Sequence, residues 1–213
     1  MGVIFMKNLT NQINKLKNSE ISEVIAARLK EFEEAGRSKS ETVFGELCFC
    51  LMTANFSAEK CINIQNEMGR GFSLLSEAEL AKELKKHGHR FPNTRANYIF
   101  EAQKCESDLC SLVGSGKDRR EKLVKDVKGL GMKEASHFLR NIGFKDVAIV
   151  DFHIVDLLKR EGLTDFDRKK CGLSKKKYLE IEAVLEDLAK KAGMNLAELD
   201  LYLWYLETGK VLK

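Results

Sequence analysis

The chain has 213 residues, of which 44% are hydrophobic and 32% charged, and its formal net charge is +4 at pH 7. This composition is that of an ordinary globular protein, long enough for one core or for two small lobes that share a cleft. There is no stretch near twenty apolar residues, and the apolar run at residues 3–6 is short. We therefore expect no membrane span, no signal peptide and a cytoplasmic location. The mild positive charge permits nucleic-acid binding without requiring it.

Helical periodicity dominates the first part of the chain. Apolar residues recur at steps of three and four over residues 21–32, until the polar stretch 36–40 interrupts them. Ser40 is expected to cap the following helix, whose apolar residues at 43–52 lie on nearly all of its faces. We therefore expect this helix in the centre of a core.

Two serines predict the starts of further helices. Ser57 precedes one of them, and Ser76 is placed to form a capping box with Glu79, three residues later. Another amphipathic segment covers residues 95–105. The presence of a single proline in the chain also favours helices with short connections over strands.

The second part of the chain continues the helical pattern with one interruption. Residues 122–143 indicate a helix, a short glycine-rich turn and a second helix. We interpret the short apolar run 147–150 as an irregular segment that enters a helix at Asp151. Helices are then expected at 174–191 and 196–206. Because no pattern favours a sheet, the predicted fold class is all-α.

The cysteines carry no metal-binding motif. No C-x-x-C pair occurs, and only Cys171 follows the glycine-rich turn, so neither a zinc ribbon nor a four-cysteine iron–sulfur loop is expected. Cys48 and Cys50 are interpreted as small hydrophobic residues of a core. We expect no metal and no cofactor.

The turn Gly129-Leu130-Gly131 is the first feature that indicates a function. Both glycines are able to take positive φ and to let a phosphate approach the backbone, while Leu130 would anchor the turn in the core. The next helix begins at once, so its free N–H groups would face a bound anion. Such a unit grips phosphate without reading sequence. The alternative, favoured for this turn taken alone, is a helix C-cap glycine in an ordinary connection.

Lys133 lies in the first turn of the helix that follows. A cation is unfavourable there because the helix N-terminus is already positive, and partial burial disfavours the charged amine further. A neutral amine is what a Schiff-base nucleophile requires. The alternative for any single lysine is an exposed side chain that extends into solvent.

Asp151 follows at the end of the apolar run. As a helix N-cap it would be held rigidly, and its carboxylate would be able to stabilise positive charge that develops at a sugar C1′ when a glycosidic bond breaks. The structural and the catalytic role are compatible. His153, two residues later, is either a phosphate contact or a histidine on a helix surface, and its residue type favours neither.

These residues together resemble the helix-hairpin-helix DNA glycosylase superfamily and, more narrowly, the archaeal-type (type 2) 8-oxoguanine DNA glycosylase/AP lyases. The resemblance covers nearly the whole chain. Its most specific parts are KEASHFLRN at 133–141 and LYLWYL at 201–206 with the tail to Lys213. Residues 46–56 and 87–91 also match the family.

The resemblance implies roles for five residues at the reacting nucleotide. Lys133 would be the nucleophile and Asp151 the essential carboxylate. Phe91 and Trp204 would stack on the flipped base, and the terminal carboxylate of Lys213 would read it. The oxidised purine carries an N7–H donor that guanine lacks, so an added acceptor would discriminate between the two bases. By residue type alone, the alternative for both aromatic side chains is that they pack in the core.

Contacts to DNA complete the predicted site. Asn55 would fill the gap left by the extruded base, while Gly129, Gly131 and His153 would hold the backbone. Candidate backbone contacts that are equally typical of a solvated face lie at residues 85–90 and 169–177.

We expect two helical lobes on either side of a DNA-binding cleft. The central lobe comprises residues 41–151, with the hairpin at about 122–143, and the second lobe comprises residues 1–40 and 152–213. The expected partner of this monomer is double-stranded DNA that contains 8-oxoguanine. The lysine would attack C1′ with help from the aspartate, and the Schiff base would lead to β-elimination and a strand nick.

Three alternatives remain open at this stage. The same fold could excise oxidised pyrimidines, although relatives of that kind carry a four-cysteine iron–sulfur loop that this chain lacks. A monofunctional glycosylase would usually lack a lysine at position 133. A DNA-binding module without catalysis would need neither Lys133 nor Asp151, and its binding to DNA would survive Lys133→Ala.

Overall fold

The computed structural model describes residues 2–114, 116 and 118–213, with side chains from residue 6 onward. Over these residues it contains helices and connecting segments and no strand, which confirms the all-α prediction. No helix of the described part is long and apolar enough to cross a membrane. The elements are α1 Gly2–Lys17, α2 Ile21–Gly36, α3 Ser40–Thr53, α4 Ala58–Met68, α5 Gly71–Leu74, α6 Glu77–Lys86, α7 Pro92–Ala102, η1 Gln103–Cys105, α8 Leu109–Val113, α9 Arg119–Asp126, α10 Met132–Asn141, α11 Phe152–Arg160, α12 Lys175–Ala192 and α13 Leu196–Thr208.

Two compact units share these helices. Unit 1 comprises Met1–Phe32 and Gly143–Lys213, and unit 2 comprises Glu33–Ile142. The two ends of the chain therefore belong to one unit, and the predicted hairpin belongs to the other. The lobes predicted around DNA, 41–151 and 1–40 with 152–213, stay a prediction about the complex.

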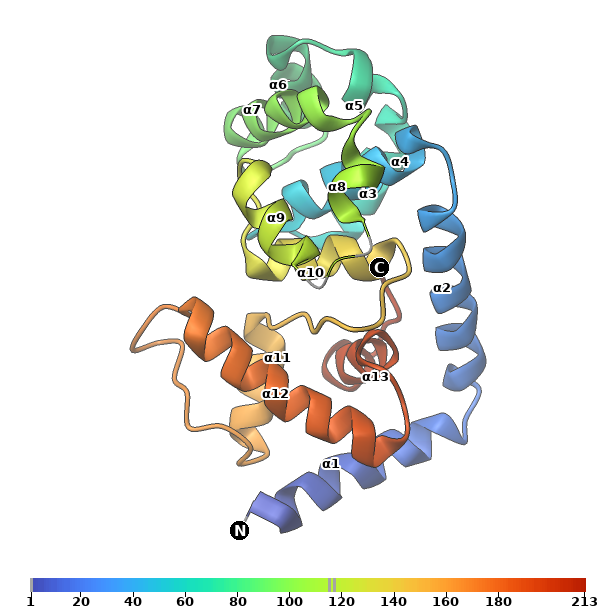
Figure 1. The fold of residues 1–213 in the computed structure, drawn as a ribbon, viewed down its shortest axis with the longest axis vertical. Helices are drawn as coiled ribbons and strands as arrows, with labels where there is room; N and C mark the ends of the chain where they lie inside the picture. Colours follow the sequence, from blue (N-terminus) through green and yellow to red (C-terminus); the bar gives the residue numbers. More distant parts are fainter. Residues whose placement is uncertain (1, 115, 117) are drawn as a thin grey trace. The chain divides into compact units, whose positions relative to one another are not determined.

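Helix α3 is the centre of unit 2. It contacts α4, α5, α7, α8 and α10, and Figure 1 shows it among these helices. Cys48 and Cys50 are completely buried on it, which confirms them as core residues. The capping role predicted for Ser40 is wrong, because the helix begins at Ser40 itself and Lys39 occupies the N-cap without a side-chain hydrogen bond.

The other predicted helix starts in unit 2 are confirmed. Ser57 accepts a hydrogen bond from the N–H of Lys60 at the start of α4. Ser76 and Glu79 form a capping box at the start of α6, each side chain bonding the other's backbone N–H. Pro92 stands at the first position of α7, where its missing N–H costs nothing.

Unit 1 is built around α13. Helices α1, α11 and α12 all pack against it, and α1 also packs along α12, as Figure 1 shows. The segment 147–150 is buried but forms neither helix nor strand, as predicted. It leads directly into α11, so its path decides where Asp151 lies.

Candidate active site

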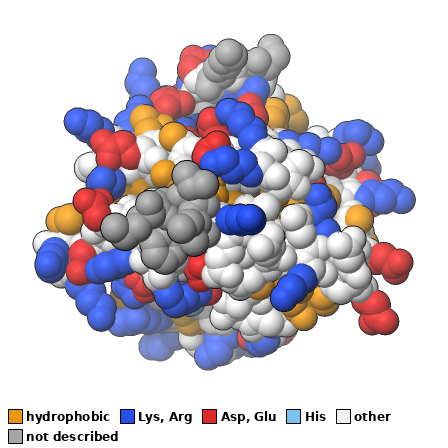
Figure 2. Space-filling view, turned by 90° about the horizontal axis from the view of Figure 1, so that it is seen from below, with side chains coloured by type: hydrophobic (Ala, Val, Ile, Leu, Met, Phe, Trp, Pro, Cys, Tyr) orange, Lys and Arg blue, Asp and Glu red, His pale blue; other side chains and the backbone are white. Residues whose placement is uncertain are grey.

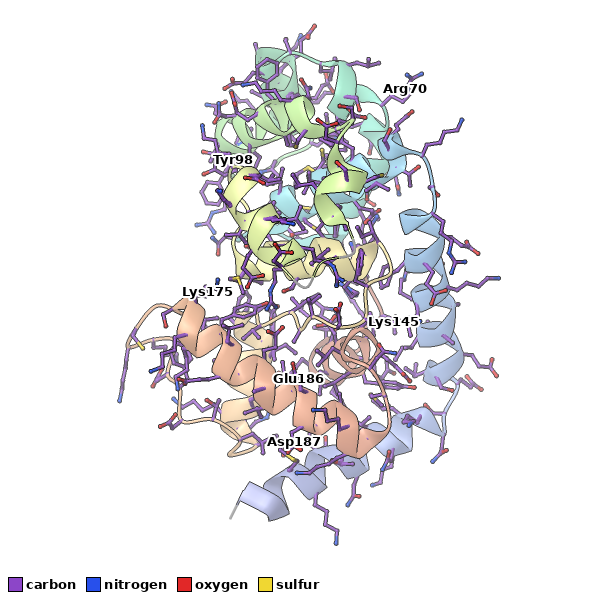
Figure 3. The ribbon with its side chains drawn as sticks, in the orientation of Figure 1. Arg70, Tyr98, Lys145, Lys175, Glu186 and Asp187 are labelled. Carbon is purple, nitrogen blue, oxygen red and sulfur yellow. The ribbon has the colours of Figure 1, made fainter. Side chains whose placement is uncertain are left out.

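A tight turn between α9 and α10 forms the predicted hairpin. Gly129 has a φ of +90°, and a Cβ at this position would lie 2.3 Å from a ring carbon of Tyr98, which Figure 3 labels on α7. Only glycine meets both constraints. Leu130 is buried, as predicted, and the ammonium of Lys128 donates to Oδ1 of Asn97 at 2.8 Å. The turn is therefore fixed against α7.

Gly131 takes a different conformation from the one predicted. Its φ is −97°, because it is the N-cap of α10, a position that requires extended backbone. Its N–H donates to Oε2 of Glu134 at 3.3 Å. A Cβ on Gly131 would lie 3.0 Å from that oxygen. The glycine therefore matters because it lets the carboxylate approach, and the positive φ expected for it is wrong.

Lys133 is the second residue of α10, and its side chain is 25% exposed. Its Nζ lies 3.8 Å from Oε1 of Glu134, and no other carboxylate among the described residues of unit 2 lies within ion-pair distance. Burial raises the pKa of the neighbouring Cys61 thiol to about 12, although Lys133 and Arg95 act to lower it. The thiol stays protonated near neutral pH, so Glu134 is the anionic neighbour of the amine.

Side chains of α12, rather than a helix or sheet, hold the segment that leads to Asp151. The N–H of Ala148 donates to Oε1 of Glu182 at 2.8 Å, and the N–H of Val150 donates to the Tyr178 hydroxyl at 3.1 Å. That hydroxyl donates to the carbonyl of Ala148 at 2.7 Å. Buried backbone without a ladder requires such partners. We call Tyr178 and Glu182 the α12 clamp.

Asp151 is the N-cap of α11, as predicted. Its Oδ1 accepts a hydrogen bond from the N–H of Ile154 at 2.9 Å, and the residue is partly buried. Among the described residues, no hydrogen bond engages its Oδ2. One oxygen therefore fixes the side chain while the other is available to a ligand.

Trp204 on α13 packs against the start of α11. The centroids of its ring and the His153 ring are 5.1 Å apart, and the two planes meet at 85°. The indole Nε1 is buried and has no hydrogen-bond partner among the residues that the structure describes. His153 also packs on Phe152, with centroids 4.1 Å apart, and the guanidinium of Arg168 lies 5.1 Å from the Phe152 centroid. Phe152 is 50% exposed, so this row of rings reaches the surface.

Phe91 lies at the surface of unit 2 rather than in its core. It is the N-cap of α7 and is 36% exposed. The buried His89 holds its backbone, because Nδ1 accepts the N–H of Phe91 at 3.0 Å while Nε2 lies 3.0 Å from the carbonyl of Met52. These partners fit a neutral ring with its proton on Nε2. Burial lowers the pKa of His89 below its ordinary value of 6.5.

Asn55 follows α3 in the left-handed region, with a φ of 59° and an exposed side chain. Asparagine tolerates this conformation better than most residues. The guanidinium of Arg95 donates to the carbonyl of Ala54 at 2.7 Å, and the Phe56 ring lies 4.2 Å from that of His89. Asn55 is therefore exposed on a turn that the same buried histidine supports.

Basic residues near the start of α12, where Figure 3 labels Lys175, are partly neutralised. Lys177 pairs with Glu180 at 2.8 Å, and in the segment that precedes α12, Asp167 pairs with Lys159 of α11 at 2.8 Å. On the face drawn in Figure 2, Lys and Arg side chains are interspersed with Asp and Glu. Charge alone therefore does not mark a DNA-binding surface on this face.

Comparison with known proteins identifies the family. The family model described as 8-oxoguanine DNA glycosylase matches residues 25–194. An 8-oxoguanine DNA glycosylase/AP lyase from Korarchaeum cryptofilum is 51% identical, and the match covers 100% of both chains. The chain belongs to the 8-oxoguanine DNA glycosylase family.

Two solved structures agree with this assignment. The crystal structure of the Methanocaldococcus jannaschii 8-oxoguanine glycosylase/lyase, in complex with 15mer DNA containing 8-oxoguanine, is 48% identical with a TM-score of 0.92. The match covers 96% of this chain and 99% of that one. The 8-oxoguanine DNA glycosylase of Thermotoga maritima is 44% identical with a TM-score of 0.92, covering 98% and 100%. The glycosylase architecture and the family predicted from the sequence are confirmed.

The predicted site residues of this glycosylase are divided between the two units. The structure brings His153 and Trp204 into contact within unit 1. Lys213 is partly exposed at the end of the tail after α13. The individual roles of these residues stay predictions. Asn55, Phe91, Gly129, Gly131 and Lys133 belong to unit 2, and Asp151, His153, Trp204 and Lys213 belong to unit 1.

Sequence reasoning does not find the residues that support this site. Glu134 caps α10 within a short motif that the sequence analysis did not single out, whereas His89 and the α12 clamp act through hydrogen bonds to residues distant in sequence. The position of Glu182 could have indicated its role, because it shares the buried face of α12 with Tyr178 and Ile181. A charged side chain on such a face requires a buried partner. Among the residues that the structure describes, no group of three or more His, Cys, Asp or Glu is placed to hold a metal ion.

Proposed function

We propose that this family member excises 8-oxoguanine from double-stranded DNA and then nicks the strand, with Lys133 as the nucleophile. The observation that carries the proposal is the position of this amine, 25% exposed in the first turn of α10 directly after the glycine turn. The names of the relatives support both activities, and the M. jannaschii complex contains the lesion in DNA. We also propose that the protein acts as a monomer and that it acts in the cytoplasm, at the nucleoid.

The lysine would make and break bonds at the sugar C1′. The lone pair of Nζ attacks C1′, the bond from C1′ to N9 breaks, and the base leaves with the bonding electrons and gains a proton. The bond from C1′ to O4′ then breaks, a proton passes from Nζ to O4′, and an imine forms between Nζ and C1′. Loss of a proton from C2′ then expels the 3′ phosphate, which nicks the strand, and water releases the lysine.

Asp151 would stabilise positive charge as it develops on the sugar. Ile154 fixes its Oδ1, and the α12 clamp holds the segment before it, so the carboxylate needs little reorganisation during the reaction. Lys133 belongs to unit 2 and Asp151 to unit 1.

The hairpin would hold the DNA backbone beside the lesion. Gly129 leaves the backbone accessible, and the N–H groups in the first turn of α10 suit a phosphate. Because the N–H of Gly131 already donates to Glu134, Gly131 would act through close backbone approach rather than as a donor. His153 would contact a second phosphate, and Asn55 would fill the gap in the duplex.

Phe91 and Trp204 would each stack on the flipped base. Both are partly exposed aromatic residues, and each is supported by a histidine, His89 for Phe91 and His153 for Trp204. The terminal carboxylate at Lys213 would accept the N7–H of the lesion. Extrusion of a base costs about a few kcal/mol, which stacking on aromatic rings partly offsets.

Borohydride trapping on a duplex with one 8-oxoguanine opposite cytosine tests this proposal. We expect wild type to release the base, nick the strand and form a covalent complex. We expect Lys133→Gln to do none of these, while Lys190→Gln, which changes an exposed lysine on α12, behaves as wild type. Base release by wild type without trapping would mean a monofunctional enzyme and would contradict the role of Lys133.

A further inference from the structure

Glu134 holds its carboxylate between the cap of α10 and the Lys133 amine. Oε2 accepts the N–H of Gly131 at 3.3 Å, and Oε1 lies 3.8 Å from Nζ of Lys133. The side chain of Glu134 is 16% exposed. A carboxylate is favourable at a helix N-terminus, so this position suits Glu134. The glutamate is thus fixed by one oxygen and presents the other to the amine.

The other ionisable groups near this pair do not replace the carboxylate. Cys61 on α4 is held protonated by its burial, which raises its pKa to about 12. Arg95 on α7 is a cation that donates to the carbonyl of Ala54. Neither group is able to take a proton from Lys133 near neutral pH.

Among the described residues, the helices that pack on α10 bring no other carboxylate within ion-pair distance of the Lys133 amine. From α3, Glu46 accepts hydrogen bonds from Asn141 at 2.9 Å and from Gln65 at 3.0 Å. From α9, Arg120 donates to Ser136 at 3.2 Å. Within the described part of the chain, the remaining charged groups on these two helices form no ion pair with Lys133 or Glu134. They are Glu41, Arg119, Glu121, Lys122, Lys125 and Asp126.

We propose that Glu134 is the proton acceptor that activates Lys133. This inference rests on the proposed role of Lys133 as the nucleophile. The bond between Nζ and one ammonium proton breaks, the proton passes to Oε1 of Glu134, and the electron pair left on Nζ forms the bond to C1′. Glu134 then carries the proton as a neutral acid, while Asp151 remains the group that stabilises charge on the sugar.

The pair of variants Glu134→Gln and Glu79→Gln tests this assignment. In both, the amide oxygen keeps a hydrogen bond from the N-cap backbone, because Glu79 and Glu134 each complete a capping box. Only Glu134→Gln removes a carboxylate that lies beside the amine of Lys133. We measure the rate of borohydride trapping on duplex DNA with one preformed abasic site, from pH 6 to pH 10, and the affinity for the same duplex.

Glu134→Gln is expected to lower the trapping rate at neutral pH by about 100-fold, the usual contribution of a positioned base. The deficit shrinks as pH rises, because solvent hydroxide then removes the proton, and DNA affinity stays within about twofold of wild type. Glu79→Gln is expected to follow the wild-type profile. A Glu134→Gln profile that parallels wild type at all pH values would overturn the inference, whereas absence of trapping by wild type would overturn the proposed function.

Discussion

The two residues proposed to act on the sugar are held in contrasting ways. The helix that carries Lys133 is capped within three residues, through Gly131 and Glu134. The segment that ends at Asp151 is held by Tyr178 and Glu182, which follow it by about thirty residues in sequence. The lysine therefore depends mainly on a short motif and the aspartate on the tertiary fold of unit 1. Substitutions in the two regions are therefore expected to differ in their effects on excision rate, stability and DNA binding.

The largest effect expected in unit 1 follows from Asp151→Asn. Asparagine is as good an N-cap as aspartate, so the variant removes the charge and leaves α11 capped. Without that charge, the rate of single-turnover base excision is expected to fall by about 1,000-fold, with the unfolding midpoint within about 2 °C of wild type. An excision rate close to that of wild type would contradict the electrostatic role.

A smaller loss is expected when the α12 clamp is broken at Tyr178→Phe. The N–H of Val150 and the carbonyl of Ala148 then lose buried partners, at a cost of about 1–3 kcal/mol. Misplacement of Asp151 is expected to slow base excision by up to about 100-fold with little change in DNA affinity.

Glu182→Gln is the matched variant for the clamp, because its amide oxygen still accepts the N–H of Ala148. We expect it to keep most of the excision rate. If Tyr178→Phe loses stability but excises 8-oxoguanine as fast as wild type, the clamp supports the fold alone and does not position Asp151.

In the hairpin, Gly129→Ala is expected to weaken DNA binding by about tenfold, because the backbone shifts where phosphate is gripped. A Cβ would collide with the Tyr98 ring at a φ of +90°. The control is Gly193→Ala after α12, which shares a positive φ of +65° but has no described atom within 4 Å of the added Cβ. Affinity for damaged and undamaged duplexes should fall together for Gly129→Ala only. A loss restricted to lesion DNA would place the turn in base recognition instead.

The smallest expected effect is a pH dependence that arises from His89. Its pKa is lower in the folded state than its ordinary value of 6.5, mainly because it is buried. Its contribution to stability is therefore intact above about pH 6.5 and is lost as pH falls towards the folded pKa. Protonation would place a hydrogen on Nδ1, which accepts the N–H of Phe91.

Thermal unfolding at pH 7.5 and pH 5 measures this contribution. The acid-side drop in Tm is expected to be about 2–4 °C larger for wild type than for His89→Gln. Equal drops for the two proteins would mean that His89 does not lose stability on protonation.

Much of the fold could be predicted from local patterns. The apolar periodicity predicts the helices, and the caps at Ser57, Ser76 and Asp151 lie where residue type favours them. The wrong predictions concern single backbone positions. Ser40 became the first residue of a helix rather than its cap, and Gly131 became a cap rather than a left-handed turn residue. At Gly131 the cap is accompanied by a hydrogen bond from its own N–H to Glu134, which the sequence analysis did not anticipate.

The candidate site was less predictable than the fold. Lys133 and Asp151 are recognisable because a motif surrounds each of them. The α12 clamp and His89 are not, because their partners lie 28 to 37 residues away in sequence. Such contacts arise only when the helices pack, so residue spacing does not specify them.

The central claim is that Lys133 forms the covalent bond to DNA. The most direct measurement is to trap wild-type protein on a duplex containing 8-oxoguanine with borohydride, digest the complex and locate the modified peptide by mass spectrometry. The account predicts one adduct, on the amine of Lys133. An adduct on any other lysine, or on the N-terminal amine, would contradict it.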